Sequence, residues 1–231
     1  MAIVDLPSPN FNARTAPIDI LLMHYTGMRT AQEAIDRLRD PAAQVSAHYV
    51  VDEDGTTYHL VAEEHRAWHA GASYWQGVRD INGHAIGIEI VNPGHEFGYR
   101  PFPDAQMQAV LELARDIVSR HRVPPARVLG HSDVAPLRKE DPAELFDWAW
   151  LAANGVGIWA KPKPCAWSDS EFLLQLGRYG YDLEGDDPAK ARGAAIVAFA
   201  RHFRPAKLVP APDPELKAVL NGLIDMMSSH A

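Results

Sequence analysis

The residues best suited to chemistry lie in one short stretch, Gly130 to Pro142, which has the sequence GHSDVAPLRKEDP. His131 follows a short apolar run that could end a strand, and functional side chains often lie where a strand leads into a loop. Asp141 comes ten residues later, with Lys139 beside it. An imidazole and a carboxylate that converge, with a lysine nearby, predict part of a metal site. The remaining ligand must lie elsewhere in the chain.

Two further residues could complete such a site. His24 directly follows the apolar run 18–23, which is typical of a mostly buried strand. Two histidines and one carboxylate would leave a zinc ion open to water and substrate, and that water could attack a carbonyl near neutral pH. Glu89 is a lone charge in the apolar strand 86–91, where a carboxylate is costly without a partner or a role. It could accept the proton of the water, and Lys139 could stabilise the oxyanion.

Each of these residues also has a simpler interpretation. The chain has 11 histidines, and most of them cannot be ligands. A strand carboxylate such as Glu89 can equally be held by a salt bridge. A second metal chemistry is open as well, because His131-Ser132-Asp133 and a distant histidine would resemble the two-histidine, one-carboxylate site of a mononuclear iron oxygenase. In that case Asp133, and not Asp141, would be the carboxylate ligand.

Alternating strands and helices are expected to position these residues. This alternation predicts an α/β layered domain. Residues 62–84, which are rich in Trp, His and Gly, are expected to form one long functional loop. The other expected elements are strand 18–23, a helix from Thr30 to Pro41, a hairpin over 47–61, strand 86–91, a helix over 103–121 and strand 127–130.

The character of the sequence changes near residue 160. The run Lys161-Pro162-Lys163-Pro164 is typical of a linker. Three short helices are expected after it, the first with Asp169 or Ser170 as its N-cap, at 169–179, 188–203 and 213–227. The chain therefore divides into an α/β domain over 1–160 and a linker plus a small helical domain over 161–231.

Composition limits the partners of the protein. The formal net charge is −8 and no basic stripe offsets it, which argues against a nucleic-acid partner. No apolar run reaches about 18 residues, so no membrane-spanning helix is expected. The single cysteine, Cys165, excludes an intrachain disulfide. Residues 1–15 lack the pattern of a secretory signal, so a cytoplasmic location is expected, or a periplasmic one if the start has been trimmed.

Five separated motifs favour one of these chemistries. In the order of the chain, they closely resemble the type 2 N-acetylmuramoyl-L-alanine amidase family, which includes the AmpD and AmiD peptidoglycan amidases. The resemblance covers about residues 5–160. The motifs are His24-Tyr25-Thr26, Ser46-Ala47-His48-Tyr49, Ala67-Trp68-His69-Ala70-Gly71, Asn82 followed by Ile86-Gly87-Ile88-Glu89, and His131 to Pro142.

The resemblance implies a zinc amidase with a mixed central β-sheet flanked by helices. It implies hydrolysis of the amide between N-acetylmuramic acid, or its anhydro form, and L-alanine, in peptidoglycan fragments or muropeptides; a monomer is expected. A non-catalytic peptidoglycan-recognition module on the same fold is the alternative, but such modules lack a zinc ligand. By position in the motifs, the zinc ligands are His24, His131 and Asp141, the catalytic acid/base is Glu89, and the transition-state stabiliser is Lys139.

Two departures from the family pattern follow Asp141. Ala143 stands where the family usually has glycine, and Phe146-Asp147-Trp148 stands where a proline often precedes the tryptophan. Residues 176–181 and 198–205 more loosely resemble the small three-helix peptidoglycan-binding domain. That resemblance implies a tail that could hold an enzyme close to polymer.

Overall fold

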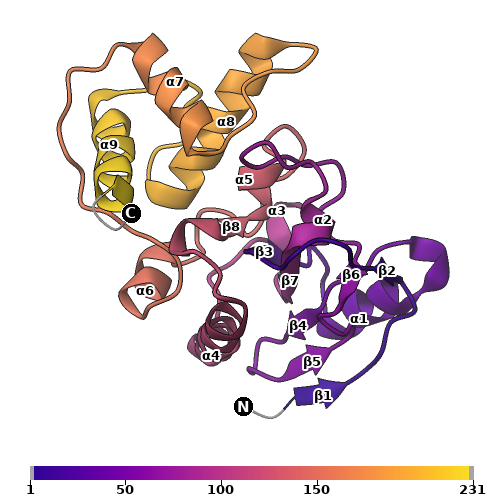
Figure 1. Cartoon of the computed structure of the whole chain (residues 1–231). Helices are drawn as coiled ribbons and strands as arrows, with labels where there is room; N and C mark the ends of the chain where they lie inside the picture. Colours follow the sequence, from indigo (N-terminus) through magenta and orange to yellow (C-terminus); the bar gives the residue numbers. More distant parts are fainter. Residues whose placement is uncertain (1–2, 229–231) are drawn as a thin grey trace.

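A computed structural model describes residues 3–228 and contains a mixed six-stranded sheet with helices on both faces (Figure 1). The strand order is β1-β5-β4-β7-β3-β8. Strands β4 and β5 are antiparallel, and the other neighbours are parallel, so the expected mixed sheet is confirmed. The strands are β1 Ile3–Asp5, β3 Ile20–Tyr25, β4 Tyr49–Val51, β5 Thr57–His59, β7 Ala85–Ile90 and β8 Val128–Gly130.

One face of the sheet is covered by α4 (Asp104–His121) and α6 (Trp148–Ala153). The apolar stripe of α4 packs on this face because its apolar residues recur at helical spacing. Alternation along the strands directs Leu21, Met23 and the three isoleucines of β7 to the same side, where they are fully buried with Val110 of α4. The nine-residue helix α1 (Ala31–Arg39) lies on the other face of the sheet, where Ile35 and Leu38 pack with Val50 of β4.

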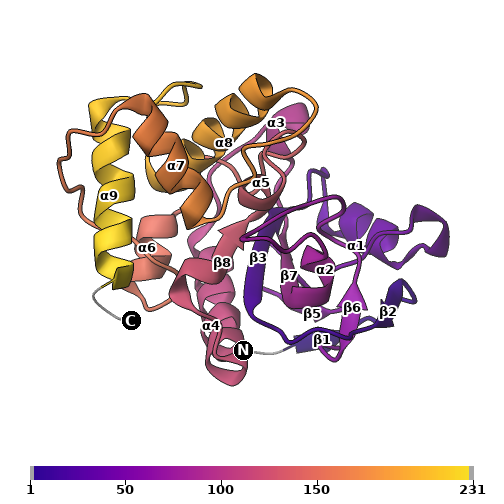
Figure 2. The same cartoon turned by 45° about the horizontal axis from the view of Figure 1, so that its top comes forward.

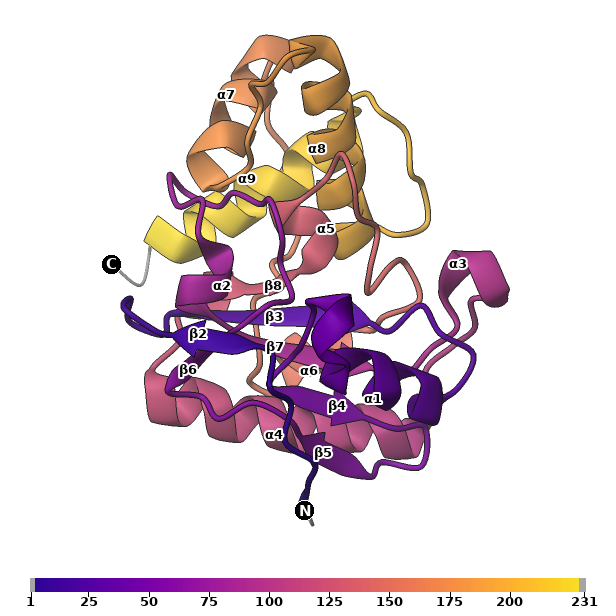
Figure 3. The ribbon, with the colours of Figure 1, turned by 90° about the vertical axis from the view of Figure 1, so that its right-hand side faces the viewer.

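The opposite face is covered by three C-terminal helices, α7 (Asp169–Tyr179), α8 (Pro188–Phe203) and α9 (Pro214–Ser228) (Figure 3). Ile20 and Leu22 point to this face and belong to the same buried cluster as Phe172 and Phe199. The end of α9 also lies beside α6 (Figure 2). The C-terminal helices therefore share an apolar core with the central strands.

The three C-terminal helices begin and end close to their expected positions. The N-cap of α7 is wrong in the sequence analysis, because Ser168 forms a capping box with Glu171. Thr30 caps α1 as expected. The linker-like run does not lie free, since the backbone N–H of Lys163 donates to the carbonyl of Ala218 in α9. The division of the chain at residue 160 stays a prediction.

Residues 62–84 are not one continuous loop. They contain β6 (His65–Ala67), which pairs with β2 (Phe11–Ala13), and the short helix α2 (Ile81–His84). Trp75 between them is fully buried, and a Cβ on Gly180 would lie 2.5 Å from its ring, so the tail meets this segment closely. Elements of three or four residues are too short for periodicity to reveal. The other short elements missed are β1, α3 Gly94–Phe97, α5 His131–Val134, and the 3-10 turns η1 Pro41–Ala43 and η2 Pro125–Arg127; the six-residue helix α6 was missed as well.

Within residues 3–228, no helix combines the length and the apolar character that crossing a bilayer requires.

Glu63 is the centre of a hydrogen-bond network that ties the loop after β5 to α4. Its carboxylate accepts hydrogen bonds from Tyr49 at 2.8 Å, from Arg120 at 2.9 Å and from His121 at 2.6 Å. Burial would raise the pKa of Glu63, but the hydrogen bonds from Arg120, His121 and Tyr49 outweigh it and lower that pKa from 4.5 to about 2.

We expect Glu63→Gln to lower the free energy of unfolding by about 1–3 kcal/mol near neutral pH, because three donors lose a charged acceptor. The folded-state pKa of Glu63 is depressed, so its contribution is complete above 4.5 and is lost as pH falls towards about 2. Urea unfolding of wild type and variant across this pH range measures the difference, with Glu64→Gln as the exposed control. A difference that stays constant with pH would contradict the assignment.

Candidate metal centre and active site

The carboxyl ends of three parallel strands meet at one place on the sheet. His24 lies near the end of β3 and is in register with Glu89 of β7, so both side chains leave the same face. Strand β8 ends at Gly130, and His131 is the first residue of α5. Ligand sites of open parallel sheets lie outside the carboxyl ends of the strands. The fold therefore brings two strands and the start of α5 to one site.

His24, His131 and Asp141 converge there and are buried. The Nδ1 atoms of the two histidines are 2.9 Å apart, and each lies 3.1 Å from Oδ2 of Asp141. Two imidazole nitrogens and a carboxylate oxygen that point to one place are a donor set suited to a zinc ion with an open position. The sequence analysis named these three residues, and the structure brings them together.

The protonation states of this group agree with metal binding. Burial, together with the neighbouring His131, lowers the pKa of His24 from 6.5 to about 4, so its imidazole is neutral near pH 7. Burial would raise the pKa of Asp141, but the two histidines outweigh it and hold that pKa well below its usual value. A neutral imidazole and an ionised carboxylate are the forms that bind metal ions.

The outer nitrogens of both histidines are held by the segment 67–71. The Nε2 atom of His24 lies 3.1 Å from Nδ1 of His69, and Nε2–H of His131 donates to the carbonyl of Ala70 at 3.0 Å. Because Nε2 of His131 carries the proton, its Nδ1 is an acceptor towards the centre. Asn82 fixes the segment, since its Oδ1 accepts from the backbone N–H groups of both His69 and Ala70.

Gly87 makes room for His69. A Cβ at this position would lie 2.6 Å from the His69 ring, which is too close for any side chain. The Gly87 N–H also donates to His48 at 3.0 Å. The sequence did not identify His24 as the partner of His69. The available signal was Gly87 itself, because a glycine inside a strand often marks the close approach of another group.

Glu89 lies on the same face as His24. Its Oε2 is enclosed and has no hydrogen-bond partner among residues 3–228, and no ion pair involves it within that range. The salt-bridge interpretation of Glu89 is therefore not supported. Burial, with the nearby charge of Asp141, raises the pKa of Glu89 well above 4.5, and Lys139 opposes that rise. An unpartnered carboxyl group in such a place is suited to proton transfer.

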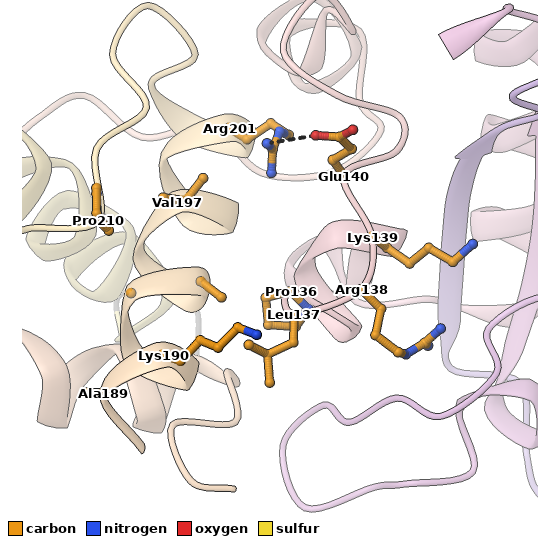
Figure 4. A pocket seen from close by; sticks show the side chains of 12 residues that line it. Pro136, Leu137, Arg138, Lys139, Glu140, Ala189, Lys190, Val197, Arg201 and Pro210 are labelled. Atoms are coloured by element: carbon orange, nitrogen blue, oxygen red, sulfur yellow. Dashed lines mark ion pairs between the residues drawn. The ribbon is translucent and has the colours of Figure 1, made fainter. Parts of the chain in front are cut away.

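Lys139 lies in the exposed loop between α5 and Asp141. Its side chain and that of Arg138 extend to the side opposite α8 (Figure 4). The positive charge of Lys139 opposes protonation of both His24 and Glu89, although it is the smallest of the effects on the pKa of each.

Asp133 is not one of the converging ligands. Its Oδ2 accepts hydrogen bonds from the Gly130 N–H at 2.8 Å and from Nδ1–H of His202 at 2.7 Å. Its Oδ1 accepts one from the hydroxyl of Tyr181. Because both oxygens are engaged and the converging group contains Asp141 instead, the interpretation of Asp133 as an iron ligand is not supported.

The two departures from the family pattern have local structural roles. Ala143 has a φ of 71°, in the left-handed region that glycine adopts most easily, so the backbone here has the conformation expected for glycine. Asp147 is the N-cap of α6 and accepts from the N–H of Trp150. Phe146 and Trp148 are buried against each other.

Known proteins resemble this chain in sequence and in fold. The family model described as N-acetylmuramoyl-L-alanine amidase matches residues 14–144. The N-acetylmuramoyl-L-alanine amidase AmiD of Escherichia coli (strain K12) is 36% identical, over 90% of this chain and 83% of that protein.

Two solved structures extend the similarity to most of the chain. One is AmiD from E. coli in complex with the substrate anhydro-N-acetylmuramic acid-L-Ala-D-gamma-Glu-L-Lys, with a TM-score of 0.82, 34% identity and coverage of 93% of this chain and 92% of that chain. The other is AMPDH3 from Pseudomonas aeruginosa in complex with anhydromuramic pentapeptide, with a TM-score of 0.78, 28% identity and coverage of 96% and 98%. Because coverage exceeds nine-tenths of this chain, the fold similarity reaches into the C-terminal helices.

Proposed function

The chain belongs to the N-acetylmuramoyl-L-alanine amidase family, and we propose that His24, His131 and Asp141 are the zinc ligands with which it works. It is an amidase that acts on muramyl–L-alanine bonds in peptidoglycan fragments. One observation carries the proposal: the three ligand atoms all lie within 4.8 Å of one another in a buried site. Two histidines and a carboxylate are the ligands of several hydrolytic zinc centres.

A zinc ion bound by these residues would supply a water of lowered pKa and would polarise the scissile carbonyl. The protein's own contribution begins with orientation. His69 and the carbonyl of Ala70 fix the outer nitrogens of His24 and His131, so that both Nδ1 atoms face the same point.

Glu89 is the proposed general acid and base. It lies beside His24 on the neighbouring strand, and its carboxyl group has no competing hydrogen-bond partner on Oε2 among the described residues. It takes a proton from the attacking water and gives it to the nitrogen of L-alanine as the amide bond breaks. Without that proton the leaving group would be an amide anion, which is far too basic to leave.

Lys139 is the proposed stabiliser of the negative charge that develops on the carbonyl oxygen. Its exposed ammonium group has no ion-pair partner in the described part of the chain, and its charge favours the ionised form of Glu89. A positive charge placed beforehand where an oxyanion develops lowers the barrier. All three ligand positions of the family pattern are filled, which argues against a non-catalytic recognition module.

The anhydro-muropeptide is the substrate form that we propose. Both solved relatives were bound to anhydromuramyl peptides. We expect the purified protein to split anhydro-N-acetylmuramyl-L-Ala-D-γ-Glu-L-Lys into the free tripeptide and the anhydro sugar. Digestion of this compound and of purified sacculi side by side, analysed by mass spectrometry, tests it. Metal-stripped protein is the control, and peptide release from sacculi alone would contradict the proposed substrate form.

The expected compartment and oligomeric state stay predictions. Cell fractionation tests the cytoplasmic location, and light scattering of the purified protein tests the monomer.

A further inference from the structure

Two adjacent residues at the end of α8 contact the two ends of the loop that carries His131 and Asp141. His202 donates to Asp133, two residues after His131, at 2.7 Å. Arg201 is paired with Glu140, which directly precedes Asp141, at 3.5 Å (Figure 4). The same Arg201 lies 3.6 Å from Glu144. The tail therefore reaches the metal-binding loop from both sides through neighbouring side chains.

Asp133 connects the tail to the first turn of α5. It is only 1% exposed, and its three donors are the N–H of Gly130, the hydroxyl of Tyr181 and the imidazole of His202. Two of these three donors belong to the tail. A buried carboxylate that loses its donors is strongly destabilised, so these contacts hold α5 in one position.

A backbone hydrogen bond links the position of α5 to both His131 and Asp141. The N–H of Ser132 donates to the carbonyl of Asp141 at 2.9 Å, which ties the turn of His131 to the backbone of the third ligand. By contrast, His24 lies within β3, which is paired on both sides with β7 and β8. Two of the three ligands thus depend on the loop, and the third is held by the sheet.

His202 itself is held rigidly. It is 4% exposed, and its ring is stacked on Trp148 at 3.9 Å and on Phe203 at 4.0 Å between ring centres. Trp148 also lies close to Gly130, since a Cβ there would be 3.3 Å from its ring. The donor to Asp133 is therefore fixed by packing and not only by its hydrogen bond.

We propose that the C-terminal helices position His131 and Asp141 and so set the affinity of the centre for its metal. Tyr181 and His202 act through Asp133, and Arg201 acts through Glu140 and Glu144; none of these residues is a ligand. The inference rests on the proposed zinc site. It gives the tail a role inside the catalytic domain, beyond the binding of polymer that the family resemblance implies. Outer partners of metal ligands typically contribute about 10- to 100-fold to affinity.

The first test removes one hydroxyl group. We expect Tyr181→Phe to bind zinc about 10-fold more weakly than wild type, measured by competition with a chromophoric chelator. Tyr179→Phe is the matched control, because Tyr179 is buried in the same aromatic cluster but makes no hydrogen bond to Asp133. It should bind zinc as wild type does. Thermal unfolding of the metal-free proteins shows separately whether either substitution lowers the stability of the fold.

The second test separates the hydrogen bond of His202 from its stacking. His202→Phe keeps the stacked ring and removes the donor, and we expect it to lower zinc affinity about 10-fold or more. His202→Asn removes the ring but can place an amide N–H where Nδ1–H stood, at the same number of bonds from Cβ, so we expect it to restore most of the affinity.

Three outcomes would overturn the inference. The first is wild-type zinc affinity in Tyr181→Phe, and the second is an equal loss of zinc affinity in Tyr179→Phe. The third is a zinc affinity that His202→Phe keeps and His202→Asn loses. If the proposed zinc site is wrong, the result is different. Wild type would then bind no zinc, or Asp141→Asn would bind zinc as tightly as wild type.

Discussion

Asp141→Asn is expected to remove metal binding and, with it, nearly all amidase activity. The substitution keeps the size of the side chain but replaces the one anionic oxygen that lies 3.1 Å from both Nδ1 atoms. Without a bound metal ion, water at the site has no lowered pKa, and the loss in kcat/KM should exceed about 10³-fold. Elemental analysis of the purified variant and its turnover of the anhydromuramyl tripeptide measure the two effects.

Asp133→Asn is the matched comparison for this variant. It makes the same change in a second buried aspartate of the same loop, one whose oxygens accept from Tyr181 and His202. We expect Asp133→Asn to bind zinc more weakly than wild type. In excess zinc, it should be fully occupied and active. Full metal content in Asp141→Asn, with loss in Asp133→Asn, would reverse the assignment of the ligand.

Glu89→Gln is expected to retain zinc and to lose about 10² to 10⁴ in kcat, because an amide cannot transfer the proton. Glutamine has the same shape, and Glu89 is not among the converging ligand atoms, so neither the fold nor the metal should be lost. Steady-state kinetics and zinc content of the same preparation are the measurements.

Two results would count against this role of Glu89. Near-normal turnover would show that another group moves the proton, and loss of zinc together with activity would make Glu89 a residue of the metal site. Glu96→Gln, on exposed α3, is the control for the chemical change alone and should behave as wild type.

The elements that the sequence predicts well are those with long periodic patterns. Helix α4 and the three C-terminal helices have apolar residues at helical spacing over many turns, and β7 alternates strictly, so local pattern determines them. The ligand set was accessible for a different reason: His24, His131 and Asp141 belong to motifs that follow one another in a family order.

The contacts between distant parts of the chain could not be predicted in this way. His202 and Asp133 are 69 residues apart, and nothing in the local pattern of α8 indicates that a polar residue on it meets a carboxylate. The partner of His69 was equally hidden, because His24 lies 45 residues away on β3. The separate tail was predicted from the linker-like run at residues 161–164, and the amphipathic pattern of its helices indicates only that a face is buried, not against which element.

The common apolar core also has a consequence for the chain as it is being made. Ile20 and Leu22 leave the ribosome early, yet the residues that cover them, from Phe172 onwards, are among the last to be translated. At roughly 5–20 residues per second, that face of the sheet lacks its C-terminal helices for on the order of 10 to 30 s. During that interval the nascent chain offers an apolar surface to chaperones and to other nascent chains. Slower translation of the last third of the message should therefore increase aggregation of newly made protein.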